Sequence, residues 1–319
     1  MKKIIITSII ILLLMGYTPY YELNDMNVID VIGITYQKSH YTMYMNVVNE
    51  NNKVYKITGK SLGELFDKSE NINTKKTYYH HLNIIIFDKN TISQQKTIPF
   101  LKNKLKKLDY LTFTSNTKLT TLFKKYHKSQ DYYNFLKKEK SNLGTITNTT
   151  FKKLLSDTLD PIKSSHLPLI SSNKIITSDG LYIIDNNLSI NKELARTSYI
   201  LNNQVNSYQD LINYQNKYYQ LEIYNLKPTI TYHKKHLKIT LEGNIDSNDT
   251  NNLKPLTKVI KKDLKKNIKD LINLETTKNL SITNINNYIY LKDRHLKNYK
   301  TCHKDINIIL TVKEKDNYD

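Results

Sequence analysis

Short apolar runs and alternating apolar and polar residues recur through the first third of the chain. Residues 28–35 (VIDVIGIT) and 41–50 (YTMYMNVVNE) have patterns typical of strands. Residues 84–87 are four consecutive apolar residues, which suits a strand covered on both faces. A helix is expected next, with apolar residues at Ile98, Leu101, Leu105 and Leu108. A strand at 109–115 then completes a β-α-β order, which predicts a mixed sheet with helices against it.

The middle of the chain has a helical pattern that polar turns interrupt. The expected helical segments are residues 117–126, 129–140 and 147–160, and Pro161 closes the last of them. Strand patterns return over residues 166–194. We therefore predict an α+β fold with two or three mixed α/β domains, each built from a mixed or antiparallel sheet with helices packed against it, and we place a domain boundary near residue 190.

The C-terminal part predicts further strands around one long helix. Residues 217–245 predict two or three alternating strands, and residues 288–293 and 305–315 predict two more. The helix spans residues 253–275, and one apolar stripe follows its length at Leu256, Ile260, Leu264, Ile268 and Leu271. Such a basic helix could lie on a membrane surface. We favour a helix laid across the C-terminal sheet with its lysines outward, because the surrounding strands need a cover.

Composition and charge narrow the class of partner. The chain has 319 residues, 39% of them hydrophobic, and a formal net charge of +19. Lysine supplies almost all of the positive charge, and arginine occurs only at Arg196 and Arg294. Specific nucleic-acid recognition relies on arginine forks, so we predict no nucleic-acid partner and favour an anionic membrane surface.

The N-terminus has the pattern of an export signal. Lys2 and Lys3 precede the apolar residues 4–15. Twelve residues of helix cover about 18 Å, well short of the roughly 30 Å of a hydrocarbon core. Residues 1–16 are therefore predicted to be a signal or a marginal anchor segment.

Residue types that perform catalysis are scattered. Cys302 is the single cysteine, which excludes an internal disulfide and a zinc cluster built from cysteines. His80 with His81, and His233 with His236, are expected to face apart on strands. The remaining group with metal-ligating residue types is His295, Cys302 and His303, which lacks a fourth ligand. We expect no catalytic residue, no metal site and no cofactor.

An acidic tetrapeptide stands between the apolar run and the first strand. Its residues are Glu22, Leu23, Asn24 and Asp25. This arrangement resembles the C-subunit family of spore germination receptors, extracytoplasmic lipoproteins in which a Cys, an acidic box of this kind and a strand ending in Gly-Ile-Asp follow a Leu-rich signal. Gly33 and Ile34 match the end of that strand, and Thr35 stands where the family usually has Asp.

The resemblance continues along the chain in the same order. The matching positions are His81, Leu82, His166, Leu167, Pro168, Gly180 and Leu194. Tyr17 occupies the position of the lipid-bearing Cys, and tyrosine cannot form the thioether of a lipid anchor. Attachment would then depend on a retained N-terminal segment, or on partners.

The resemblance implies the organisation and role of the chain. It implies a signal or anchor at residues 1–16, a germination-receptor C-subunit domain at 17–190 and a C-terminal α+β domain at 191–319. It also implies a non-enzymatic subunit at the outer face of the spore inner membrane or cell membrane, with two integral membrane partners, the A-type and B-type germination proteins. The acidic box either caps a turn or contacts a basic loop of such a partner. The rival hypothesis is a soluble exported module that binds anionic polymers or lipid surfaces through its lysines.

Overall fold

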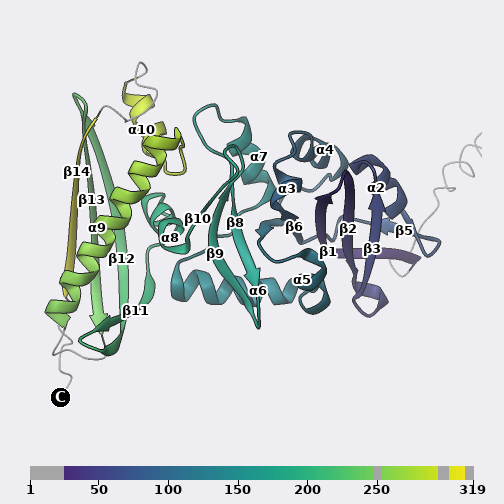
Figure 1. The fold of residues 1–319 in the computed structure, drawn as a ribbon, viewed down its shortest axis with the longest axis horizontal. Helices are drawn as coiled ribbons and strands as arrows, with labels where there is room; N and C mark the ends of the chain where they lie inside the picture. The colour runs from purple at the N-terminus through teal and green to yellow at the C-terminus, as the bar shows by residue number, and fades with distance from the viewer. Residues whose placement is uncertain (1–24, 248–252, 294–301, 313–319) are drawn as a thin grey trace, which may run out of the picture.

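Two sheets and their covering helices form an elongated molecule (Figure 1). The computed structural model describes residues 25–247, 253–293 and 302–312. Within these residues, ten strands form the first sheet and four form the second. The predicted α+β class is confirmed.

The first sheet is mixed, as the β-α-β order predicts. Its strands are β1 (Met26–Gln37), β2 (His40–Val47), β3 (Lys53–Gly59), β4 (Asn71–Ile72), β5 (Lys75–Tyr78), β6 (Ile84–Asp88), β7 (Leu111–Ser115), β8 (His166–Ser172), β9 (Ile176–Ile183) and β10 (Leu188–Ile190). Their order is β10-β9-β8-β7-β6-β1-β2-β3, and β5 pairs with β1 and β4. The central strands β1, β6, β7 and β8 run parallel, and antiparallel strands flank them on both sides.

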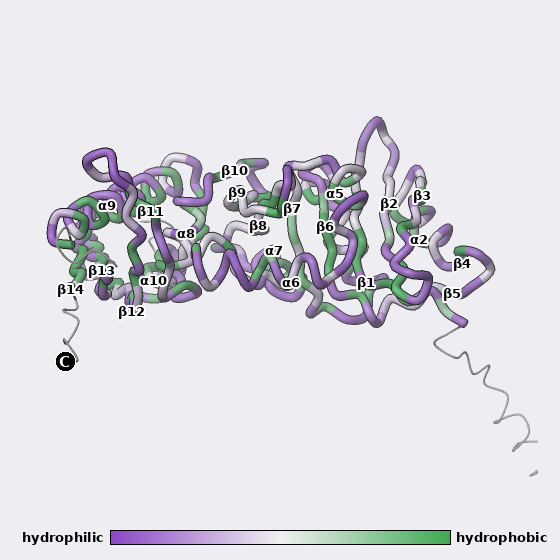
Figure 2. Tube along the Cα trace, turned by 90° about the horizontal axis from the view of Figure 1, so that it is seen from below, coloured by the Kyte–Doolittle hydropathy of each residue, from purple (hydrophilic) through white to green (hydrophobic). Residues whose placement is uncertain are grey.

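The parallel strand β6 is covered on both faces, as its apolar run predicts. Ile85 and Phe87 pack into one hydrophobic cluster, and Ile84 and Ile86 pack into another on the opposite face. The first cluster is closed by α2 (Leu62–Ser69), α3 (Lys89–Ile92), α4 (Thr97–Lys104) and α7 (Phe151–Leu159). The second is closed by α5 (Leu119–Lys125) and α6 (Ser129–Lys138). Figure 2 shows the hydrophobic segments of β6 and β7 in the interior.

The second sheet has the order β11-β12-β13-β14. Its strands are β11 (Tyr208–Tyr214), β12 (Lys217–His233), β13 (His236–Ser247) and β14 (His303–Val312). Its helices are α8 (Lys192–Leu201), α9 (Leu253–Lys278) and α10 (Ile285–Lys292). Helix α9 lies along one face of this sheet (Figure 1), and its five stripe residues are buried in a shared core. The prediction that this helix lies across the C-terminal sheet is confirmed.

One hydrophobic core joins the second sheet to the end of the first. Leu181 and Ile183 of β9 and Ile190 of β10 belong to the same cluster as the buried face of α9. Helix α8 lies between them, since its Ala195 and Tyr199 are part of that cluster. The last strand of the first sheet ends at Ile190 and the second sheet begins at Tyr208. The boundary near residue 190 stays a prediction.

Three local predictions were wrong. Residues 288–292 belong to helix α10 rather than to a strand, because Ile285 and Ile289 are four residues apart and both are buried. The helix predicted to reach Leu108 ends at Lys104, and Leu105 enters the core in an extended conformation. His80 and His81 lie in a turn between β5 and β6, not on a strand.

Gly180 lies inside β9, and only glycine fits there. Its φ is +118°, and a Cβ atom built on it would lie 2.0 Å from the carbonyl oxygen of Ile190. The register between β8 and β9 shifts at this point, between Leu169 and Ile170. The missing side chain therefore lets β10 approach β9 closely, with its backbone against the strand.

We expect Gly180→Ala to lower the free energy of unfolding by roughly 3 kcal/mol, through backbone strain and the clash with Ile190. Gly63→Ala is the matched control, because a Cβ there meets only the Ser61 hydroxyl oxygen, at 3.7 Å. That change should stabilise helix α2 by at most about 1 kcal/mol. Urea denaturation of both variants measures the difference, and equal stabilities would contradict this account of Gly180.

Candidate functional site

The motif residues that carry the family resemblance mostly build the fold. Ile34, Leu82 and Leu167 are almost completely buried. A Cβ on Gly33 would lie 2.4 Å from the ring of Phe123, so the glycine allows α5 to pack closely on β1. Pro168 is buried in β8, opposite Leu181 of β9. These residues position the strands and contribute no reactive group.

Thr35, which replaces the family's usual Asp, has a partner in this chain. Its hydroxyl group donates a hydrogen bond to a carboxylate oxygen of Asp88 at 2.7 Å. The other carboxylate oxygen of Asp88 accepts from the backbone N–H of Thr91 at 2.9 Å and so caps α3. An Asp at position 35 would face this carboxylate with a like charge, so Thr35 and Asp88 form a compatible pair.

The membrane-proximal residues lie largely outside the described part of the chain. Tyr17, Glu22, Leu23, Asn24 and the predicted signal at residues 1–16 all fall outside it. Asp25 is described, and it is exposed immediately before β1. Of the helices in the described ranges, none has both the length and the hydropathy that a bilayer span requires.

The histidines are arranged differently from the prediction. His233 and His236 pair directly across the turn between β12 and β13, because the chain reverses between them. His236 also pairs with His303 of the parallel strand β14, with ring centroids 5.1 Å apart. Among the described residues, no group of three His, Cys, Asp or Glu side chains could hold a metal ion. His295 lies outside these residues.

Cys302 is buried just before β14. Burial raises the pKa of its thiol, although Lys304 and Lys235 act in the opposite direction. A thiol in this environment stays protonated at neutral pH, which makes it a poor nucleophile.

His166 lies in a polar pocket of about 260 Å³. Residues 153–166 line one side of the pocket, and residues 202–204 and 281–284 line the other. The buried carboxylate of Asp157 lies 2.6 Å from the ammonium nitrogen of Lys153 and 3.8 Å from that of Lys163. The Nδ1 atom of His166 lies 2.9 Å from the Ser164 carbonyl oxygen, which fits a neutral ring with its proton on Nδ1. Burial lowers the pKa of His166 from 6.5, while the Ser164 carbonyl and the Asp157 carboxylate oppose this shift.

The opposite wall of this pocket belongs to the C-terminal part and is fixed by Glu275 of α9. Its buried carboxylate accepts backbone hydrogen bonds from Ile282 and Thr283, each at 2.6 Å. The neighbouring Ser281 donates its backbone N–H to the Ser164 hydroxyl at 2.9 Å, and Ser164 returns a backbone bond to the Ser281 carbonyl at 3.0 Å. A continuous polar connection therefore runs from α9 to the strand that begins at His166.

Because His166 has a lowered pKa in the folded state, the unfolded chain binds its proton more readily. Stability should therefore fall as the pH drops below about 6.5. We expect His166→Gln to reduce the loss of thermal stability between about pH 7 and pH 5.5. The exposed His40 provides the control variant, His40→Gln, which should keep the wild-type dependence. Identical pH profiles for all three proteins would contradict the role of His166.

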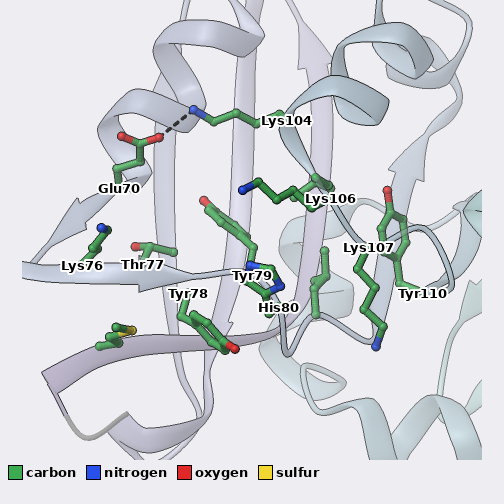
Figure 3. Close-up of a pocket in the computed structure, with 13 residues that line it drawn as sticks. Glu70, Lys76, Thr77, Tyr78, Tyr79, His80, Lys104, Lys106, Lys107 and Tyr110 are labelled. Carbon is green, nitrogen blue, oxygen red and sulfur yellow. Dashed lines mark hydrogen bonds and ion pairs between the residues drawn. The ribbon is translucent and has the colours of Figure 1, made fainter. Parts of the chain in front are cut away.

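A second pocket lies beside the start of β1 and is rich in lysine (Figure 3). We call it the lysine cleft, and its volume is about 520 Å³. Lys76, Thr77 and Tyr78 come from β5, Lys104 from the end of α4, and Lys106 and Lys107 from the loop that follows. The sequence analysis missed this site. The density of lysine in residues 102–107 was a visible signal, but nothing local indicates that β5 lies beside that loop.

Two comparisons with known proteins found a similarity. Residues 19–172 match the family described as the spore germination protein N-terminal domain. The fold is similar to the crystal structure of the GerBC protein, with a TM-score of 0.55 and 10% sequence identity, over 89% of this chain and 97% of that chain. Curated protein sequences gave no match.

Just under half of the chain is therefore similar to the N-terminal domain of spore germination proteins. The resemblance to the C subunits of germinant receptors, expected from the acidic box and the ordered motifs, is confirmed.

Proposed function

We propose that this chain is a non-enzymatic, membrane-associated subunit of a nutrient germinant receptor and is required for spore germination. The observation that carries the proposal is the match of residues 19–172 to the spore germination protein N-terminal domain. The similarity of the fold to that of GerBC, over 89% of this chain, supports it. In this proposal the folded part of the chain contacts the partner subunits of the receptor.

The proposed membrane attachment is supported by the pattern of the N-terminal sequence. The apolar residues 4–15 precede the domain, and Tyr17 replaces the cysteine that carries lipid in the family. The proposal is a retained N-terminal segment that holds the domain at the outer face of the spore inner membrane. In this proposal the acidic box would lie close to that surface, and Asp25, its described residue, is exposed.

The proposed partners are two integral membrane subunits, the A-type and B-type germination proteins. Together the three subunits would convert the binding of an amino acid or sugar into ion and dipicolinate release. The box at residues 22–25 would contact a basic loop of one partner, since opposite charges attract strongly near a low-dielectric membrane. The non-enzymatic role rests on the receptor function of the family, and the buried, protonated Cys302 fits it.

A second candidate function is a soluble exported module that binds anionic polymers or lipid surfaces. The observations in its favour are the formal net charge of +19 and the lysine cleft. It differs from the first proposal in the strength of membrane attachment, because electrostatic binding is screened by salt and insertion of an apolar segment is not.

We expect deletion of the gene to abolish germination in response to at least one nutrient, while germination triggered by non-nutrient agents stays intact. The measurement is the loss of optical density of purified spores after each trigger, in a strain without other nutrient receptors. Complementation with the wild-type gene should restore the response. An unchanged nutrient response in the deletion strain would refute the receptor proposal.

In fractionation of spores or sporulating cells, we expect the chain to stay with the membrane after a wash in about 1 M salt, where the screening length is only about 3 Å. Detection by antibody after the wash provides the measurement, and a soluble basic protein bound to the same membranes serves as the control that is released. Release of the chain along with the control would favour the soluble exported module.

A further inference from the structure

The lysine cleft has an excess of positive charge. Four lysines and one glutamate line it, which gives a net charge of +3 with His80 neutral. Glu70 pairs with Lys104 at 2.6 Å. Lys107 lies 3.8 Å from the exposed carboxylate of Asp109, a separation at which an exposed pair contributes little. The charge of Lys106 faces no ion-pair partner among the described residues.

The lysines reach the cleft from two sides. Figure 3 shows Lys106 pointing from its loop toward the β5 side, where Lys76, Thr77 and Tyr78 lie. Lys76 and Lys106 are exposed, and Lys104 and Lys107 are half-buried. Lysine side chains therefore line part of a space of about 520 Å³, which suits a compact anion that accepts several hydrogen bonds.

The interior of the cleft is apolar. Leu82 and Leu105 line it and are almost fully buried, and the rings of Tyr78 and Tyr110 add aromatic surface. Tyr110 is itself held in place by its ring contact with Phe151, with centroids 5.2 Å apart. Ammonium groups next to an apolar wall match a ligand that is part phosphate and part hydrocarbon. A fully hydrated inorganic anion would gain nothing from the apolar wall.

The cleft also lies close to the proposed membrane attachment. Met26, the first residue of β1, lines it, and the apolar run ends eleven positions earlier, at Met15. Eleven residues can span at most about 40 Å. A chain tethered through that run therefore keeps the cleft within reach of the lipid headgroups.

We propose that the lysine cleft binds the phosphate of an anionic phospholipid headgroup, with the first carbons of the lipid against the apolar wall of the cleft. The headgroup would hold the N-terminal part of the domain in one orientation on the bilayer and leave the acidic box facing the integral partners. The membrane as the source of the phosphate rests on the proposed function, whereas the capacity of the cleft to bind a phosphate ester does not.

The test measures binding of short-chain lipids to the full chain in a neutral detergent, by isothermal titration calorimetry. Dihexanoyl phosphatidylglycerol is the anionic probe, dihexanoyl phosphatidylcholine is the zwitterionic one, and glycerol 3-phosphate represents a free phosphate ester. The test variant is Lys106→Gln with Lys107→Gln. The matched control, Lys137→Gln with Lys138→Gln, removes the same charge from exposed positions on α6. Circular dichroism and the thermal midpoint verify that both variants fold.

We expect the wild-type chain and the control variant to bind phosphatidylglycerol equally, and to prefer it to phosphatidylcholine. Removing two lysines should weaken binding about thirtyfold, since each lysine near an anionic surface contributes about fivefold. Equal affinity for the two lipids, or unchanged binding by the test variant, would overturn the proposal. If glycerol 3-phosphate bound as tightly as the lipid, the membrane would be wrong as the source.

These outcomes are separable from those of the germination experiment. If deletion abolishes nutrient germination but the chain binds no lipid, the lipid proposal for the cleft is refuted and the receptor proposal stands. If the chain binds phosphatidylglycerol specifically but the deletion strain germinates normally, the lipid proposal for the cleft stands and the receptor proposal is refuted.

Discussion

Burial of strand β6 on both faces is the constraint on which the N-terminal architecture depends. Four consecutive apolar residues cannot leave one face of a sheet in water, so helices must cover both sides. Ile85 and Phe87 meet the cluster closed by α2, α3, α4 and α7, and Ile84 and Ile86 meet the cluster under α5 and α6. Parallel neighbours follow, because the crossover helices that supply the cover return the chain in the same direction.

The motif residues of the family serve this arrangement. Gly33 has no side chain where α5 crosses β1, and Gly180 has none where β10 approaches β9. These two glycines therefore serve the fold, whereas the four lysines that line the proposed lipid-binding cleft lie outside the motif positions.

Much of the fold could be predicted from the sequence, because its strongest signals are local. The apolar run at residues 84–87 and the apolar stripe along α9 each predict buried side chains. Both sets of residues are buried in the structure. Short or ambiguous patterns failed. Residues 288–293 alternate like a strand, yet the spacing of Ile285 and Ile289 decided in favour of a helix.

Contacts between distant segments could not be predicted, because local patterns do not indicate which segments lie side by side. His233 and His236 seemed to diverge because the turn between them could not be located, and they pair across the hairpin. The lysine cleft joins Lys76 to Lys106 across thirty positions, through the pairing of β5 with β1. The periodicity of β5 and of the loop around Lys106 does not predict that the two segments lie side by side.

The parallel ladder between β13 and β14 has a consequence for how the chain acquires its structure. His236 pairs with His303, sixty-seven positions later, so the last strand cannot add until almost the whole polypeptide has been synthesised. Contacts of such long separation carry a high loop-closure entropy and form slowly. Until then β13 presents an unpaired edge, which is prone to intermolecular association. Forms that end before residue 303 leave this edge of β13 unpaired, whereas the central strands of the first sheet pair over shorter separations and can assemble earlier.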